Sequence, residues 1–177
     1  MNLSTHVGLM ASYNEWMNTQ LYAAAAQLSP QALTENRGAF FGSIIGTLNH
    51  LVVSDTMWLK RFALQLTDNP ILQPVRELPA PDALNEILFT DLEQLAGRRR
   101  LLDKVLCELA QNLDETTLNG TLCYKNTKGV EATRNLFSVL MHVFNHQTHH
   151  RGQTTTLLSQ AGVDVGITDL IVRIPAE

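Results

Sequence analysis

Apolar residues recur every three or four positions over four long stretches of this sequence, and helix-breaking residues fall between those stretches. This period is typical of amphipathic helices that bury one face against each other. The chain has 177 residues, which is the size of a single domain. We therefore expect residues 1–177 to form one all-α domain, a four-helix bundle. The predicted helices span about residues 3–28, 43–66, 82–113 and 133–160.

The ends of these stretches carry recognisable boundary residues. Ser43 and Asp82 are typical N-caps for the second and third helices, and Gly162 follows the fourth as a typical C-cap glycine. Prolines between residues 70 and 81 are expected to keep that segment out of a helix. Before the last helix, β-branched residues flank the turn at 126–129, which predicts a short β-hairpin. The residues after Gly162 are expected to pack on the outside of the bundle.

Charge, hydropathy and cysteine content limit the classes of function. The formal net charge is −4 and the longest basic run is residues 98–100, so the chain lacks the positive surface that nucleic-acid binding requires. No apolar run approaches the ~20 residues of a membrane span, and the first residues do not resemble a signal peptide. Cys107 and Cys123 are expected to be free thiols. We therefore predict a cytoplasmic protein with no nucleic-acid or membrane partner.

Four of the six histidines lie within residues 141–150, on one predicted helix. His142, His146 and His150 share a stripe with core-type residues, where an imidazole without a partner costs about 1–3 kcal/mol. A metal ion would satisfy their ring nitrogens. His142 and His150 lie about 12 Å apart along the helix axis, too far to bind one ion, so every feasible pair includes His146. The spacing leaves three pairs open, namely His146 with His142, with His149 or with His150.

A third ligand would come from a facing helix, and His50 in the second helix is the obvious candidate. Three imidazoles with one open position form a site of the catalytic rather than the structural type. Nitrogen ligands suit zinc, nickel, copper or iron. From spacing alone, hydrogen-bonded core or surface histidines remain the alternative. The second helix is apolar on two faces, so we expect one face in the core and the other against a partner subunit, which predicts a homodimer.

Several polar residues are candidates for supporting roles. Arg151 can clamp an anion or pair with an acidic neighbour. Gln153 lies on the histidine stripe, where it can hydrogen-bond a ligand imidazole or a substrate. Asp55 falls on an apolar face and needs a buried partner, which is a histidine, a helix end or a structural ion pair. Tyr124, beside the predicted turn, is a candidate for the mouth of a pocket.

Taken together, these residues resemble the DinB (damage-inducible) family of four-helix-bundle proteins over nearly the whole chain. The strongest match is residues 140–153, which contain His146, three further residues and then a histidine, arginine, glycine and glutamine. This run looks like the family's His-x-x-x-His-Arg-Gly-Gln signature, which is far more specific than two spaced histidines. The remaining matches are residues 13–18, which look like the family's Tyr-Asn-x-Trp-x-Asn motif, residues 48–51 and residues 124–129.

The resemblance implies a site for one divalent metal, zinc or nickel before iron or manganese. The implied ligands are His50, His146 and His150. The residues expected around the metal or along its pocket are His142, His149, Arg151, Gln153 and Tyr124. Relatives of this bundle include thiol-dependent S-transferases and a mycothiol-dependent maleylpyruvate isomerase, so a low-molecular-weight thiol is the implied second cofactor. The expected function is metal-dependent chemistry on a small molecule, either thiol transfer or hydrolysis, and the alternative is a non-catalytic metal-binding or stress-response bundle.

Overall fold

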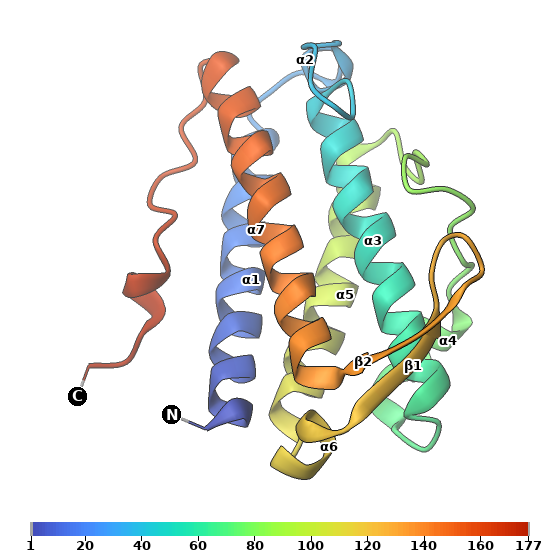
Figure 1. Cartoon of the computed structure of the whole chain (residues 1–177). Coiled ribbons are helices and arrows are strands. Elements are labelled where there is room, and N and C mark those ends of the chain that lie inside the picture. Colours follow the sequence, from blue (N-terminus) through green and yellow to red (C-terminus); the bar gives the residue numbers. More distant parts are fainter. Residues whose placement is uncertain (1, 177) are drawn as a thin grey trace.

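The computed structural model describes residues 2–176 and shows four long helices packed as a bundle (Figure 1). α1 packs against α5 and α7, and α3 packs against the same two helices. α1 and α7 run in one direction and α3 and α5 in the other, because the long connection after α3 carries the chain back along the bundle (Figure 1). The all-α bundle predicted from the periodicity is confirmed. The bounds are α1 Leu3–Ala25, α3 Ile44–Gln65, α5 Leu92–Asn112 and α7 Leu136–Gln160.

The two helices that carry the histidines begin at polar N-caps. The side chain of Ser43 accepts from the backbone N–H of Gly46 and caps α3, as the sequence predicted. Asn135 caps α7 in the same way through the N–H of Ser138. These caps satisfy N–H groups that have no partner inside the helix, and they fix where the histidine-bearing turns begin.

The third long helix begins later than predicted. Asp91, and not Asp82, accepts from the backbone of the first turn and caps α5. The backbone N–H and carbonyl of Phe89 are both bonded to the side chain of Asn49 on α3. Because this tertiary contact holds the segment before α5 against α3, the local cap signal at Asp82 does not start a helix.

The prediction that residues 70–81 contain no helix is wrong for their first part. Pro70–Leu72 forms the short 3-10 helix η1, and Gln73–Glu77 forms α4. Pro70 and Pro74 both lie in the first turn of their helix, where the backbone N–H has no intrahelical partner. The prolines therefore begin these short helices instead of preventing them.

The predicted hairpin is present before the last helix. After the short helix α6 (Glu115–Asn119), β1 (Thr121–Lys125) pairs antiparallel with β2 (Glu131–Asn135). Residues 133–135 still belong to this pairing, so α7 begins at residue 136 and not at 133. The hairpin lies beside α3 and α7 (Figure 1). A further short helix, α2 (Pro30–Thr34), precedes α3.

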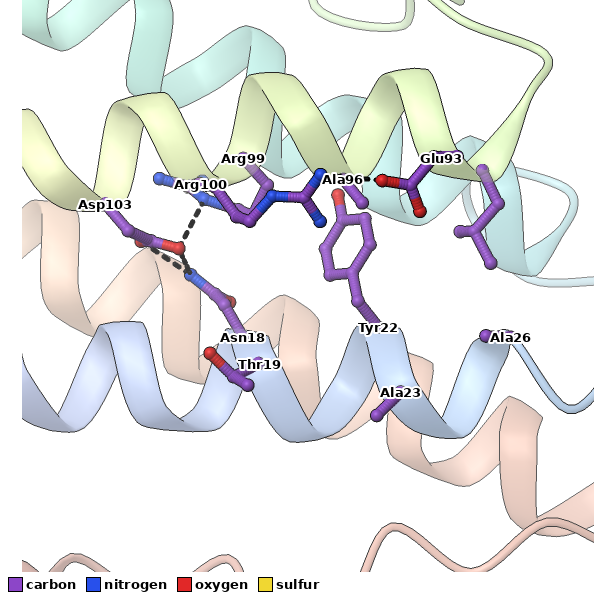
Figure 2. Close-up of a pocket in the computed structure, with 11 residues that line it drawn as sticks. Asn18, Thr19, Tyr22, Ala23, Ala26, Glu93, Ala96, Arg99, Arg100 and Asp103 are labelled. Atoms are coloured by element: carbon purple, nitrogen blue, oxygen red, sulfur yellow. Dashed lines mark hydrogen bonds and ion pairs between the residues drawn. The ribbon is translucent and has the colours of Figure 1, made fainter.

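A charged network is buried between α1, α3 and α5. Nη1 of Arg99 lies 2.8 Å from Oδ2 of Asp55, and its Nε lies 3.1 Å from Oδ2 of Asp103. Asn14 and Asn18 of α1 donate to Asp103, and the contact of Asn18 is visible in Figure 2. The buried partner expected for Asp55 is therefore Arg99, in a structural ion pair and not with a histidine.

The C-terminal segment runs back beside α1 on the outside of the bundle (Figure 1). Val163 and Val165 are buried, and the Tyr13 hydroxyl donates to the carbonyl of Thr168 at 2.6 Å. The 3-10 helix η2 (Leu170–Arg173) follows. The outside packing predicted for this segment is confirmed.

Residues 44–56 of α3 are all buried within the single chain. α2, α4 and the loop that contains Phe89 cover the side of α3 that does not face α5 and α7. The face of α3 that was expected to meet a partner subunit is therefore covered within the chain, and the homodimer stays a prediction. Cys107 and Cys123 are free thiols, as predicted. Over residues 2–176, none of the helices combines the length and the apolar content needed to cross a bilayer.

Candidate metal centre

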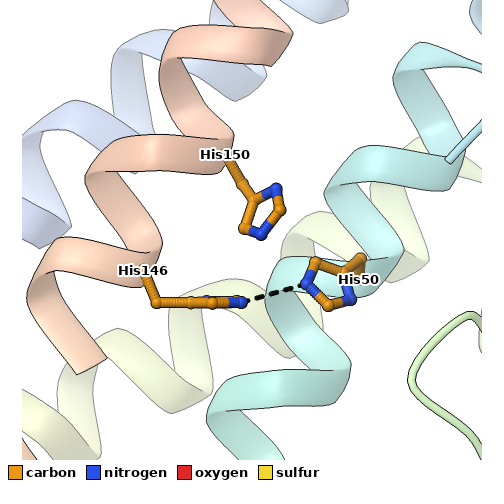
Figure 3. Close-up of side chains that lie close together, drawn as sticks. All are labelled: His50, His146 and His150. Carbon is orange, nitrogen blue, oxygen red and sulfur yellow. Dashed lines mark hydrogen bonds between the residues drawn. The ribbon is translucent and has the colours of Figure 1, made fainter. Parts of the chain in front are cut away.

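Three histidines from two facing helices converge on one point. His50 extends from α3, and His146 and His150 extend from α7 toward it (Figure 3). One ring nitrogen of each lies within 4.8 Å of the other two, and the Nε2 atoms of His50 and His146 are 3.0 Å apart. Of the three pairs that the spacing left open on the last helix, the structure brings together His146 and His150, one turn apart.

Neighbouring groups set the tautomer of two of these imidazoles. Nδ1 of His50 lies 2.8 Å from the carbonyl oxygen of Leu84, and Nδ1 of His150 lies 2.8 Å from Oε1 of Gln153. A carbonyl oxygen only accepts, so both Nδ1 atoms carry the proton and both Nε2 atoms present a lone pair. A second nitrogen anchored in this way is typical of histidines that bind a metal.

The surroundings of the three rings favour their uncharged form. Burial, reinforced by the neighbouring imidazoles, lowers the pKa of His146 to about 3. Burial also lowers the pKa of His50 and of His150 below the ordinary histidine value. Neutral imidazole is the form that binds a metal, so burial favours the form of these rings that an ion needs.

A cation satisfies this arrangement better than hydrogen bonds do. If Nε2 of His146 donates its proton to His50, the lone pair of His150 still has no donor within the cluster. A divalent ion held by His50, His146 and His150 would engage one lone pair of each ring. The donor set is three nitrogens without a carboxylate, which suits zinc, nickel, copper or iron and not magnesium or calcium.

A phenylalanine that the residue pattern did not predict covers the cluster. The ring of Phe41 stacks on that of His50 at 3.9 Å and an interplanar angle of 17°, and lies 5.5 Å edge-on from His150. Phe41 fits there because position 46 is glycine, since a Cβ on Gly46 would overlap the carbonyl oxygen of Phe41. Phe41 and the three histidines line a cavity of about 710 Å³ with a mainly apolar wall. The available signal was the pair of aromatic residues just before the Ser43 cap.

Asn49 is a second residue whose role the pattern did not predict. Its side-chain oxygen accepts from the N–H of Phe89 at 3.0 Å, and its amide donates to the carbonyl of Phe89 at 2.9 Å. These bonds hold the loop before α5 against α3. The same loop supplies Leu84, whose carbonyl orients His50. Asn49 is the neighbour of His50 in the segment that resembles the family, which is the signal that could have found it.

His142 and Tyr124 lie beside the cluster and outside it. The ring of His142 is 6.1 Å from that of His146 and 5.3 Å from that of Trp58. Tyr124 on β1 packs edge-on against Trp58 at 5.2 Å. Both line a smaller cavity that also reaches His50 and His146.

His149 and Arg151 lie outside the three-histidine cluster. The His149 ring is 4.8 Å from the His150 ring, and its Nε2 is 3.2 Å from the Gln153 amide nitrogen. Arg151, which is 3% exposed, donates to the side-chain oxygen of Asn14 on α1. Arg151 thus connects α7 to α1, and no acidic ion-pair partner for it lies among residues 2–176. One residue beyond His150 is a rotation of about 100° around the helix, which explains why it leaves the histidine face.

Comparison with known proteins identifies the family. The model of the DinB family matches residues 1–176. The chain belongs to the DinB family. "Protein DinB" from Bacillus subtilis (strain 168) is 29% identical to this DinB-family chain over 157 residues, which cover 89% of the chain and 87% of the Bacillus protein. The search of solved structures gave no match.

Proposed function

We propose that this DinB-family protein binds one divalent metal ion through His50, His146 and His150 and uses it in small-molecule chemistry, either transfer of a thiol to an electrophile or hydrolysis. The observation that carries this proposal is the convergence of three imidazoles from α3 and α7 within 4.8 Å. Three protein ligands leave a position for water or substrate, as in catalytic metal sites. The family resemblance supports the same three ligands.

The residues around the site prepare it for this chemistry. When bound, a divalent ion lowers the pKa of a thiol or a water at its open position, which supplies a nucleophile near pH 7. The Leu84 carbonyl and Gln153 hold two of the rings in the orientation that presents their lone pairs. Phe41 covers one side of the cluster, and the mainly apolar cavity that it lines offers room for a small molecule beside the three rings.

Zinc or nickel is the metal we propose first, and iron or manganese next. The all-nitrogen donor set supports zinc and nickel over manganese, which prefers oxygen ligands. A low-molecular-weight thiol is the second cofactor we propose, on the strength of the resemblance to thiol-dependent relatives.

Turnover by the metal-loaded protein tests the proposed activity. Protein loaded with each of these metals in turn is assayed with a panel of low-molecular-weight thiols, electrophiles and hydrolysable esters. We expect turnover in the wild type that disappears after chelation and in His146→Ala. The matched control is His6→Ala, because His6 packs on Phe137 and not in the cluster. Fully metal-loaded protein that turns over no member of the panel would overturn the proposed enzymatic activity. It would favour a non-catalytic metal-binding or stress-response bundle.

The homodimer and the cytoplasmic location are also proposals. The exposed apolar side chains of Ile167, Ile171 and Val172 in the C-terminal segment support an interface with a second copy. Sedimentation velocity at two concentrations tests the dimer, and a single monomeric species at both would overturn it.

A further inference from the structure

A second cavity reaches the histidine cluster from the side of the hairpin. It has a volume of about 290 Å³ and is lined by His50 and His146 together with residues of α3 and the β1–β2 turn. It is distinct from the larger apolar cavity that Phe41 lines. The α3 and hairpin residues that matter here are Trp58, Arg61, Tyr124, Asn126 and Thr127.

Arg61 gives this cavity its charge. Among the described residues that line the cavity, it is the only arginine, lysine, aspartate or glutamate. Its guanidinium carbon lies 4.4 Å from the centre of the Trp58 ring and 5.1 Å from the centre of the Tyr124 ring. Two aromatic faces hold a guanidinium without occupying its N–H groups, so Arg61 is positioned with its donors still available.

Among the residues that the structure describes, none accepts a hydrogen bond from Arg61. Within residues 2–176, seven of the other arginines bond to a side chain or carbonyl, and only Arg98 shares the unbonded state of Arg61. Glu131 lines a groove that also contacts Arg61, but the two side chains form no ion pair. Arg61 is half-buried, and burial lowers the pKa of its guanidinium. A partly desolvated cation without a partner strongly favours an anion.

We propose that Arg61 recognises the carboxylate of a small organic anion whose other end reaches the histidine cluster. The second half of this assignment rests on the metal site proposed above, while recognition of the carboxylate by Arg61 does not. The amide of Asn126 and the hydroxyls of Thr127 and Tyr124 line the same cavity and offer further donors. A single guanidinium matches a single carboxylate in two parallel hydrogen bonds.

The position of Arg61 on α3 sets the length of this ligand. Arg61 lies about three turns beyond His50, or ~16 Å between Cα atoms along the axis, and its side chain leans back toward the start of the helix. The carboxylate and the group that meets the metal must therefore be separated by several bonds. A molecule of one or two carbons is too short to engage both.

Binding of matched thiols tests the proposal. The probes are mercaptoacetate, 3-mercaptopropionate and 6-mercaptohexanoate. Each is compared with the mercapto alcohol of equal chain length, in which a hydroxyl replaces the carboxylate. Hexanoate and inorganic phosphate are tested as well. Trp58 packs against Arg61 and is one of two tryptophans, so its fluorescence in a Trp16→Phe background reports binding. Metal content is measured in every sample. The variants are Arg61→Gln, Arg61→Lys and the matched control Arg98→Gln. The guanidinium carbon of Arg98 lies 5.4 Å from the centre of the Phe89 ring, and Arg98 does not line this cavity.

We expect the longer mercapto acids to bind roughly tenfold or more tightly than the matched alcohols, as for a hydrogen bond to a charged group. Arg61→Gln removes this preference without changing the affinity for the alcohols. Arg61→Lys restores part of the preference, and Arg98→Gln leaves it intact. Equal affinity for acid and alcohol, or an unchanged preference in Arg61→Gln, overturns the proposal. Tighter binding of phosphate than of hexanoate overturns the carboxylate assignment. If the histidines bind no metal, the metal proposal fails, and Arg61-dependent binding of hexanoate still decides the role of Arg61.

Discussion

Gln153 shows how one side chain outside the ligand set acts on the proposed metal. Its oxygen accepts from His150 at 2.8 Å and thereby keeps the Nε2 lone pair toward the cluster. Loss of such an anchor typically weakens metal binding about 10–100-fold. We expect Gln153→Ala to raise the Kd for zinc by that factor, measured by competition with a chromogenic chelator. Thr156→Ala, an exposed change on the same helix, is the control, and equal Kd values in both variants would contradict the anchoring role.

Tyr22 offers a test of a buried polar group that has no evident function. Its hydroxyl lies in the cavity between α1 and α5 and has no partner among the described residues (Figure 2). Because a buried hydroxyl without a partner costs free energy, we expect Tyr22→Phe to leave the free energy of unfolding unchanged or to raise it by up to about 1 kcal/mol. Urea denaturation measures this, and a loss of more than that amount would show that the hydroxyl is bonded.

At the scale of single residues, the sequence predicts the clustered histidines better than it predicts the residues that pack around them. Spacing on the last helix allowed three histidine pairs, and the Arg-Gly-Gln extension singled out the pair that the structure brings together. Phe41 and Asn49 could not be found in this way, because each acts across a tertiary contact to a residue on another element. The direction of Arg151 also depends on Asn14, far away in the chain.

Among the elements, the loop before α5 is the one that the site depends on most. Asn49 holds Phe89 of this loop by two hydrogen bonds, and the Leu84 carbonyl in the loop orients His50. At about 1 kcal/mol per bond, we expect Asn49→Ala to lower the free energy of unfolding by roughly 1–3 kcal/mol and to weaken zinc binding. Proteolysis within the loop should become faster than in Asn112→Ala, a solvent-facing control. Unchanged proteolysis and unchanged zinc affinity would contradict the account of this loop.

The same loop marks where prediction from local signals fails. Ser43 and Asp82 are both sound N-caps by residue type, and only Ser43 is used, because the chain after Asp82 is bonded to α3. Pro70 and Pro74 begin short helices for a local reason, their place in the first turn, which the composition of the segment alone does not show. Helices with strong periodicity were predictable, whereas connections were decided by packing.

For the whole molecule, the proposed ion would act as a crosslink between α3 and α7. A ligand that binds the folded chain alone stabilises it by about 2.7 kcal/mol at 100 times its Kd. We expect added zinc to raise the Tm of wild-type protein and a chelator to reverse the rise. His146→Ala should show the same Tm with and without zinc. A rise of equal size in His146→Ala would place the zinc effect outside the cluster.

The histidine cluster and the buried ion pairs lie at different helix interfaces of the bundle. The histidines lie where α3 faces α7, while the ion pairs of Arg99 with Asp55 and Asp103 lie toward α1 and α5. The fold class and the hairpin followed from the sequence, because they depend on local period and turn residues. The running direction of the helices did not, because it depends on the path of the long connection after α3.

The most direct test of the metal centre is elemental analysis of protein without a purification tag, since a histidine tag would itself bring metal. Wild type is compared with His50→Ala, His146→Ala and the control His6→Ala, each shown to be folded by circular dichroism. The account predicts about one ion per chain in the wild type and in His6→Ala, and its loss in the other two variants. Folded wild-type protein that holds no ion after reconstitution, or full metal content in His146→Ala, would contradict it.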